Sequence, residues 1–185
     1  MSYSLNIDPG PTHSGVCFYD LARAVPTAFG WLTNAEVLDR IRHGRKLGFT
    51  HCIVERIKAR GMAVGHQAAF DTAEYAGRCL QRAEDCGLTA EGLYQDDVRL
   101  HVCGTMRAKP SNIRAALIDR FGGEAATKKS TKCSRKRHEG CPKCDGSGRI
   151  GADGILVQMV GDHTVSALGV AVTWGDKHRG LPFSP

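Results

Sequence analysis

The chain contains no apolar stretch near the roughly 20 residues that a membrane-spanning helix requires, which excludes an integral membrane protein. Its first residues have neither the basic segment nor the apolar core of a secretory signal, so we expect a cytoplasmic protein. The sequence also has no internal repeat and no low-complexity tail. At 185 residues, one globular domain with room for a small insertion is expected.

The composition is that of a soluble globular protein, with 42% hydrophobic and 24% charged residues. The net charge is +6, and Lys and Arg concentrate in segments 40–46, 56–60, 107–109 and, most densely, 128–137. Basic proteins attract polyanions because binding to phosphates releases counterions, so the charge favours a nucleic-acid partner. A solvated basic surface is the alternative that charge alone leaves open.

Apolar patterning predicts strands over 4–7, 15–20 and 27–32, joined by short connections. Asn34 can cap a following helix that runs to about Leu47. The remaining expected elements are a strand over 52–54, a helix over 65–86, a strand over 98–103, and helices over 112–121 and 162–174. Strands and helices interleaved in this way predict an α/β fold around one mixed central sheet.

Acidic residues occur at the ends of three predicted elements. Asp8 ends the first strand before a Pro-Gly break, Glu55 ends the fourth, and Asp162-His163 begins the last helix. If the first and fourth strands are neighbours, both carboxylates emerge at one edge of the sheet. Oxygen ligands from separate elements suit Mg²⁺ or Mn²⁺. Two such ions can orient a water and stabilise the leaving oxygen of a phosphodiester.

Each of these residues also has a structural interpretation. Asp8 can belong to a turn, Glu55 can pair with Arg56 or Lys58, and Asp162 can cap the final helix. Taken singly, the structural interpretation is favoured, because a lone carboxylate usually lies on a solvated surface. Taken together, at these positions, they favour a metal site.

The eight cysteines fall into two groups. Five lie in apolar or amphipathic surroundings, where a thiol behaves as a small hydrophobe: Cys17, Cys52, Cys79, Cys86 and Cys103. The other three form a cluster with one histidine: Cys133, His138, Cys141 and Cys144. Four sulfur and nitrogen ligands at this spacing are typical of structural Zn²⁺. Cysteines in a disordered basic loop are the alternative.

Residues 124–150 contain few large apolar side chains and many Lys, Arg, Gly and Cys. We therefore expect a zinc-binding module inserted within a single domain over 1–185, stabilised largely by its metal. Its basic residues suggest an added contact with DNA.

Four segments, in order, carry a family resemblance: Asn6-Ile7-Asp8-Pro9-Gly10 with Ser14-Gly15, Ile53-Val54-Glu55, Lys109-Pro110-Ser111-Asn112-Ile113, and the segment 163–171. They resemble the first strand, the fourth-strand glutamate, the lysine-led helix and the final helix of the RuvC-type Holliday junction resolvases. These enzymes belong to the RNase H-like nuclease superfamily. The resemblance spans most of the chain outside 122–150, and the family does not generally carry the zinc-knuckle-like insertion.

The resemblance implies an RNase H-like fold, Mg²⁺-dependent cleavage of branched DNA, and a homodimer that cuts two strands symmetrically. Asp8 would bridge two ions, Glu55 would hold one, and Asp162 or His163 the other. His163 matches a position that is Asp or His in the family, and it can alternatively move protons. Ser166 stands where an acidic residue is expected; Asp162, or a water held by the serine hydroxyl, would take that place.

Four cations are expected to contact DNA phosphates, which position DNA without reading its sequence: Arg56, Lys58, Arg60 and Lys109. Solvated surface charge is the alternative for them. The leading hypothesis is a crossover junction endodeoxyribonuclease, a metal-dependent endonuclease for Holliday junctions or related branched double-stranded DNA. A phage enzyme acting in the host cytoplasm is the expected setting, because the compact chain and zinc insertion differ from a cellular resolvase.

Two alternatives remain. The first is a protein that binds branched DNA without cutting it, on a degenerate RNase H-like scaffold, which Ser166 keeps open. The second is a nuclease acting on RNA–DNA hybrids, since the fold does not dictate the substrate.

Overall fold

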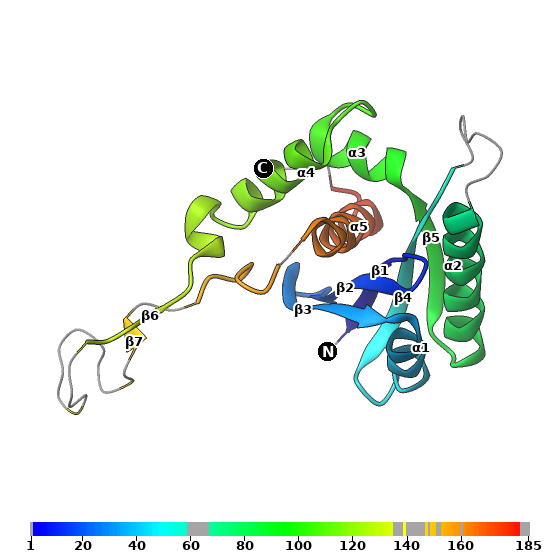
Figure 1. Cartoon of the computed structure of the whole chain (residues 1–185), viewed down its shortest axis with the longest axis horizontal. Helices are drawn as coiled ribbons and strands as arrows, with labels where there is room; N and C mark the ends of the chain where they lie inside the picture. The colour runs from blue at the N-terminus through cyan, green and yellow to red at the C-terminus, as the bar shows by residue number, and fades with distance from the viewer. Residues whose placement is uncertain are drawn as a thin grey trace.

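The computed structural model describes residues 2–58, 67–134, 139, 147, 149–150, 153–159 and 161–181. Its elements are β1 (Tyr3–Asp8), β2 (His13–Asp20), β3 (Val25–Thr33), α1 (Asn34–Arg42), β4 (Phe49–Arg56), α2 (Gln67–Asp85), β5 (Thr89–Tyr94), α3 (Gln95–Cys103), α4 (Pro110–Arg120), the 3-10 helix η1 (Gly123–Thr127), β6 (Thr131–Lys132), β7 (Arg149–Ile150) and α5 (Asp162–His178). Helices α1 and α2 cover one face of the main sheet, and α5 covers the other (Figure 1). The expected α/β fold is confirmed.

The main sheet has the strand order β3-β2-β1-β4-β5. Strands β1, β2 and β3 are antiparallel neighbours, whereas β4 runs parallel to β1 and β5 runs parallel to β4. The pairing of β1 with β4 therefore confirms that the first and fourth strands are neighbours. Parallel strands end at the same edge of the sheet, so Asp8 and Glu55 leave it side by side.

Helix α5 is buried around almost its whole circumference, from Thr164 to Asp176. One side packs on β1 and β2, and the opposite side packs on α3 and α4. A helix that is apolar all round belongs in a protein core, and the Ala- and Val-rich sequence of α5 has this character. This position explains why the helix persists to His178, beyond the predicted end at 174.

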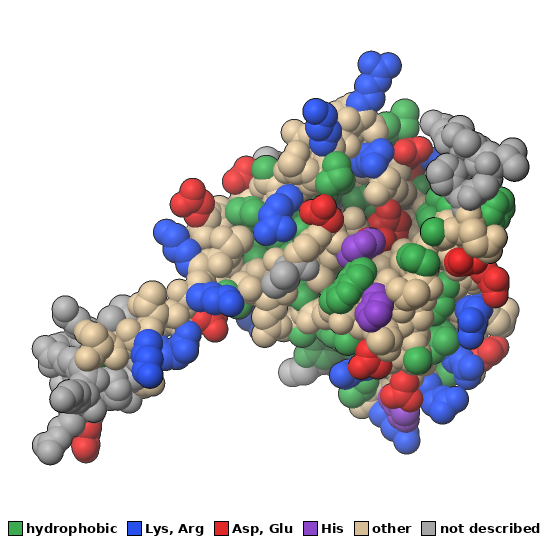
Figure 2. Space-filling view, in the orientation of Figure 1, with side chains coloured by type: hydrophobic (Ala, Val, Ile, Leu, Met, Phe, Trp, Pro, Cys, Tyr) green, Lys and Arg blue, Asp and Glu red, His purple; other side chains and the backbone are tan. Residues whose placement is uncertain are grey.

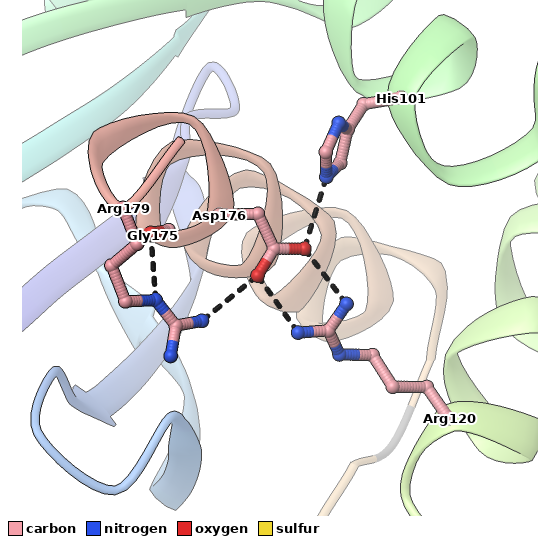
Figure 3. A network of polar contacts seen from close by, with 5 residues as sticks. All are labelled: His101, Arg120, Gly175, Asp176 and Arg179. Atoms are coloured by element: carbon pink, nitrogen blue, oxygen red, sulfur yellow. Dashed lines mark hydrogen bonds and ion pairs between the residues drawn. The ribbon is translucent and has the colours of Figure 1, made fainter. Parts of the chain in front are cut away.

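A buried carboxylate fixes the C-terminal end of α5. Asp176 accepts two hydrogen bonds from Arg120 at 2.7 and 2.8 Å, one from Arg179 at 2.8 Å, and one from His101 at 3.0 Å (Figure 3). The side chain of Asp176 is only 1% exposed. Burial of its charge is compensated by this network, which ties α5 to α3 and α4.

The predicted strand over 98–103 is wrong, because these residues belong to helix α3. Val98 and Val102, four residues apart, are buried, whereas Leu100 between them is 52% exposed. Acidic residues in the first turn and Gly104 with φ 70° after the last turn are favourable ends for a helix. The strand is β5, which directly precedes this helix; its sequence, Thr-Ala-Glu-Gly-Leu-Tyr, lacks a regular apolar alternation.

Helix α1 ends at Arg42 rather than near Leu47, and Thr33 rather than Asn34 caps it. Thr33 and Glu36 form a reciprocal capping box. Asn34 instead donates hydrogen bonds from its amide to the carbonyl oxygens of Gly10 and Pro11, at 3.1 and 3.2 Å. It therefore holds the loop that follows Asp8.

The region 124–150 begins with η1 and contains the short pair β6 and β7, which projects away from the main body (Figure 1). Exposed Lys and Arg side chains gather where it leaves the body (Figure 2): Lys128, Lys129, Lys132 and Arg149. Of the predicted zinc ligands, Cys133 is buried, and His138, Cys141 and Cys144 lie outside the described residues. None of the described helices is long and apolar enough to cross a membrane.

Candidate active site

A buried and a partly buried carboxylate lie next to each other at the end of the central strands. Ile7 pairs with Val54 in the β1–β4 register, which makes Asp8 and Glu55 the next neighbours along the strands. Ile53 belongs to the core under α5, so Glu55, two residues later, faces the same side. Glu55 is 7% exposed, and the Asp8 side chain is 13% exposed.

The two carboxylates repel each other when both are ionised. Burial raises the pKa of Glu55 to about 8; the charge of Asp8 adds to this, and Arg99 opposes it. Burial likewise raises the pKa of Asp8, although His163 and the Ser166 hydroxyl act in the opposite direction. Paired buried carboxylates of this kind favour a bound cation, since a divalent ion removes both the repulsion and the unfavourable burial of charge. The donor chemistry therefore fits Mg²⁺ or Mn²⁺.

The start of α5 supplies the third side of the site. His163 Nδ1 lies 2.8 Å from Asp8 Oδ2 and donates a hydrogen bond to it. This bond raises the pKa of His163 above its usual value, against the effect of burial. Asp162 is exposed and lines the same cleft, together with Ser166. The structure thus places Asp8 beside both Glu55 and His163, and Asp162 lines the same cleft.

Gly15 allows α5 to approach this closely. It lies opposite Asp8 in the β1–β2 ladder, and a Cβ atom at this position would come within 2.4 Å of the backbone of His163. Any larger residue would therefore displace the start of the helix. The close approach of α5 therefore explains why glycine occupies position 15 in the Ser14-Gly15 motif.

The carboxylates open into a cleft of about 560 Å³. Its lining combines acidic and basic side chains: Asp8, Pro9, Glu55, Arg56, Ile57, Lys58, Gln95, Asp96, Arg99, Pro110, Asp162, His163 and Ser166. A cleft with carboxylates at its base and cations on its wall can bind a phosphate and a metal ion together.

Arg99 is a candidate site residue that the sequence does not reveal, because the apolar pattern of the segment 98–103 predicts a strand. It projects from α3 into the cleft, and its charge lowers the pKa of Glu55. Its Nε atom is buried and has no hydrogen-bond partner in the described part of the chain. A guanidinium on the wall of a cleft, with an N–H group still available, is suited to a bound phosphate oxygen.

The other predicted cations lie at different depths. Lys58 Nζ is 3.1 Å from Asp96 Oδ2 and 4.7 Å from the centre of the Tyr94 ring. Arg56 lies over the same ring at 5.2 Å. The cation that acts on Glu55 is Arg99 rather than Arg56 or Lys58. Lys109 is exposed before Pro110, at the start of α4, and Arg60 lies outside the described residues.

The predicted set of four metal ligands is not fully assembled. Among residues 2–58, 67–134 and the described parts that follow, no three His, Cys, Asp or Glu side chains converge closely enough to hold a metal. The carboxylate pair is the part of the set that the fold brings together. His163 is engaged with Asp8 and would have to rotate to bind a metal itself.

The whole chain resembles solved structures of RuvC. The structure of Thermus thermophilus RuvC superposes with a TM-score of 0.62 at 14% sequence identity, covering 97% of this chain and 98% of that one. The chain has a RuvC-like fold. The T. thermophilus RuvC structure in complex with a Holliday junction substrate gives a TM-score of 0.60 at 16% identity, covering 98% and 99% of the two chains. No protein-family model and no curated protein matches the sequence.

The RuvC-like fold confirms the expected RNase H-like arrangement of a mixed five-stranded sheet flanked by helices. It accounts for Asp8 and Glu55 meeting at one edge of the sheet, under the start of α5. At 14–16% identity the likeness establishes the fold and leaves the activity to be argued from the site.

Proposed function

We propose that this protein is a metal-dependent endonuclease that cleaves Holliday junctions or related branched DNA. The observation that carries the proposal is the carboxylate pair Asp8 and Glu55 at the ends of neighbouring strands, with His163 at the start of α5 hydrogen-bonded to Asp8. The RuvC-like fold supports it, since a solved structure with this fold is a complex with a Holliday junction.

In this proposal Asp8 and Glu55 hold Mg²⁺ or Mn²⁺. The metal, when bound, supplies activation of a water and stabilisation of charge on the phosphate. Both carboxylates must be ionised to hold it, and the raised pKa of Glu55 makes that ionisation depend on pH near neutrality. His163 either moves a proton or, after releasing Asp8, joins Asp162 as a ligand.

The cations of the cleft position the DNA strand. Arg99, beside Glu55, would donate hydrogen bonds to the phosphate that is cut, while Arg56 and Lys58 hold neighbouring phosphates. Lys109 and Arg60 would extend this contact, as would the exposed cations of the region 124–150. Symmetrical cutting of both strands at a junction would require two copies of the chain, so a homodimer belongs to the proposal.

The test compares labelled four-way junction, linear duplex and RNA–DNA hybrid, each with Mg²⁺ or Mn²⁺, for the wild type and Asp8→Asn. Junction cleavage that the variant loses supports the proposal, because the amide cannot hold the cation as a carboxylate does. Tight junction binding without cleavage in either metal would instead favour a protein that binds branched DNA without cutting it. Ser166, which stands in place of an acidic ligand, is the residue that supports this alternative. Preferential cleavage of the hybrid would change the substrate.

We also propose that Cys133, His138, Cys141 and Cys144 bind structural Zn²⁺ within a module over 124–150 that contacts DNA. Purified protein should then contain one zinc per chain. The double variant Cys141→Ser and Cys144→Ser should lose the zinc and bind the junction more weakly. Unchanged zinc content and affinity would refute this assignment.

A further inference from the structure

One of the two tryptophans of the chain is exposed beside the carboxylates. Trp31, on β3, is 51% exposed, whereas Trp174, on α5, is 4% exposed. Trp31 lies opposite Gly15 in the β2–β3 ladder, on the face of the sheet that α5 covers. Buried hydrophobic residues form one cluster on each face of the sheet, and Trp31 belongs to neither. An indole that is half in water keeps a large apolar surface free for a ligand.

Two imidazole rings extend this surface. The ring of His13 stacks on Trp31, with centroids 5.7 Å apart and an interplanar angle of 11°. The ring of His163 lies 4.6 Å from Trp31 on a tilt of 33°. Histidine and hydrophobic side chains are exposed side by side on this face (Figure 2). The three side chains form an aromatic surface that spans β2, β3 and the start of α5.

This aromatic surface is continuous with the candidate active site. His163 contacts Trp31 with its ring and Asp8 with its Nδ1 atom, at 2.8 Å. One side chain, His163, therefore separates Trp31 from the carboxylates, so a base next to a phosphate bound there would be within reach of Trp31. The basic wall of the cleft, at Arg99, lies on the other side of the carboxylates and is suited to the phosphates rather than the bases.

We propose that His13, Trp31 and His163 form a stacking surface for an unpaired nucleobase at the branch point of bound DNA. The inference rests on the proposed function for the identity of the ligand. Nucleobases stack on exposed aromatic side chains irrespective of sequence, since every base has a π-face. In a duplex the bases are stacked on each other, whereas at a branch point a base can leave its pair. The surface therefore selects branched over linear DNA next to the site of cutting.

Tryptophan fluorescence tests the contact between Trp31 and a nucleobase directly, since Trp31 is the exposed one of the two tryptophans. The full-length chain carrying Asp8→Asn is used because we expect it to bind DNA without cutting it. It is titrated with a four-way junction, a linear duplex and a single-stranded oligonucleotide. We expect the junction and the single strand to quench the emission and the duplex to leave it nearly unchanged. The same titration of Trp31→Phe, which leaves only Trp174, should show no quenching.

Two substitutions separate stacking from packing. Trp31→Phe keeps an aromatic face, so junction affinity should stay within about twofold of the parent. Trp31→Leu keeps apolar volume without a π-face, so junction affinity should fall about tenfold, as expected for one lost base–aromatic stack, with duplex affinity unchanged. Thermal melting of both variants confirms that each is folded.

The proposal would be overturned if the Trp31→Phe and Trp31→Leu variants bound the junction equally tightly and single strands did not quench the emission of the protein that retains Trp31. A Leu variant that cuts the junction more slowly but binds junction and duplex as tightly as the parent would also overturn it, because Trp31 would then only position His163. The proposed function fails separately. If single strands quench Trp31 while the wild type cuts no junction with Mg²⁺ or Mn²⁺, the stacking surface stands and the nuclease assignment falls.

Discussion

Gly15 leaves the space in which the backbone of His163 lies, directly across the β1–β2 ladder from Asp8. The absence of one methyl group therefore sets the distance between the last helix and the first carboxylate. The hydrogen bond from His163 to Asp8 depends on this approach.

Replacing Gly15 by alanine should push the start of α5 away from the sheet. We expect a loss of stability of about 1–3 kcal/mol, typical of overpacking, and a larger loss of cleavage than of junction binding. Denaturation and single-turnover cleavage measure the two effects. Gly77→Ala is the matched control: an alanine there meets nothing within 4 Å, so the better helix former should leave stability unchanged or raise it. Equal behaviour of the two variants would contradict the role of Gly15.

The raised pKa of Glu55 predicts a pH-dependent stability without metal. Its usual value is 4.5 and its folded value is about 8, so the folded state binds the proton more tightly. Stability should therefore fall as pH rises between these values, by at most about 1.4 kcal/mol per unit. Urea denaturation in EDTA at pH 5 and pH 8 measures this slope. Glu55→Gln should flatten it, and Mg²⁺ should stabilise the wild type more at pH 8 than at pH 5. A wild-type slope that the variant retains would exclude Glu55 as its source.

Arg99 should contribute to cutting more than to binding. Its guanidinium lies on the cleft wall beside Glu55, so Arg99→Ala should lower the single-turnover cleavage rate about 100-fold, as for loss of a donor to the reacting group. Arg99→Lys should recover part of this loss because it restores the charge without the planar fork. Arg40→Ala, at an exposed position on α1, controls for the loss of one positive charge. A rate equal to that of the control would remove Arg99 from the site.

The buried network around Asp176 should be essential to the fold. Burial disfavours its charge, but hydrogen bonds from Arg120 and His101 outweigh this and hold the pKa of Asp176 below its usual range. Asp176→Asn should destabilise the protein by about 3–5 kcal/mol at neutral pH, since buried guanidinium groups lose their counter-charge. A carboxyl group whose pKa is lower in the folded than in the unfolded state stabilises the fold at pH values above its unfolded pKa. This stabilisation is lost as pH falls through the folded pKa, so the stability difference between wild type and Asp176→Asn should shrink in acid. Asp119→Asn, on the exposed side of α4, should change stability by less than about 0.5 kcal/mol. Denaturation of both variants at pH 7 and at a pH well below 3.8, the ordinary pKa of the carboxyl group, tests this.

The sequence predicted the carboxylate pair because both residues end apolar strands, and strand ends are local features. It predicted His163 through the start of an apolar helix. It could not predict Arg99, since Val98, Leu100 and Val102 satisfy both a strand and a helix pattern; tertiary packing of Val98 and Val102 decides for the helix. Trp31 was missed for another reason. Its importance comes from contacts with His13 and His163, which only the folded sheet brings together.

The burial of α5 predicts how substitutions far from the cleft affect the protein at different temperatures. Asp176 lies 13 residues after His163 on one helix, which corresponds to about 20 Å at 1.5 Å per residue. The helix is held at both ends, by its close approach to Gly15 and by the arginines around Asp176, so loosening the far end also loosens the end at the candidate active site. Substitutions around Asp176 should therefore behave as temperature-sensitive alleles, active in the cold and inactive on warming, although every residue of the cleft is intact.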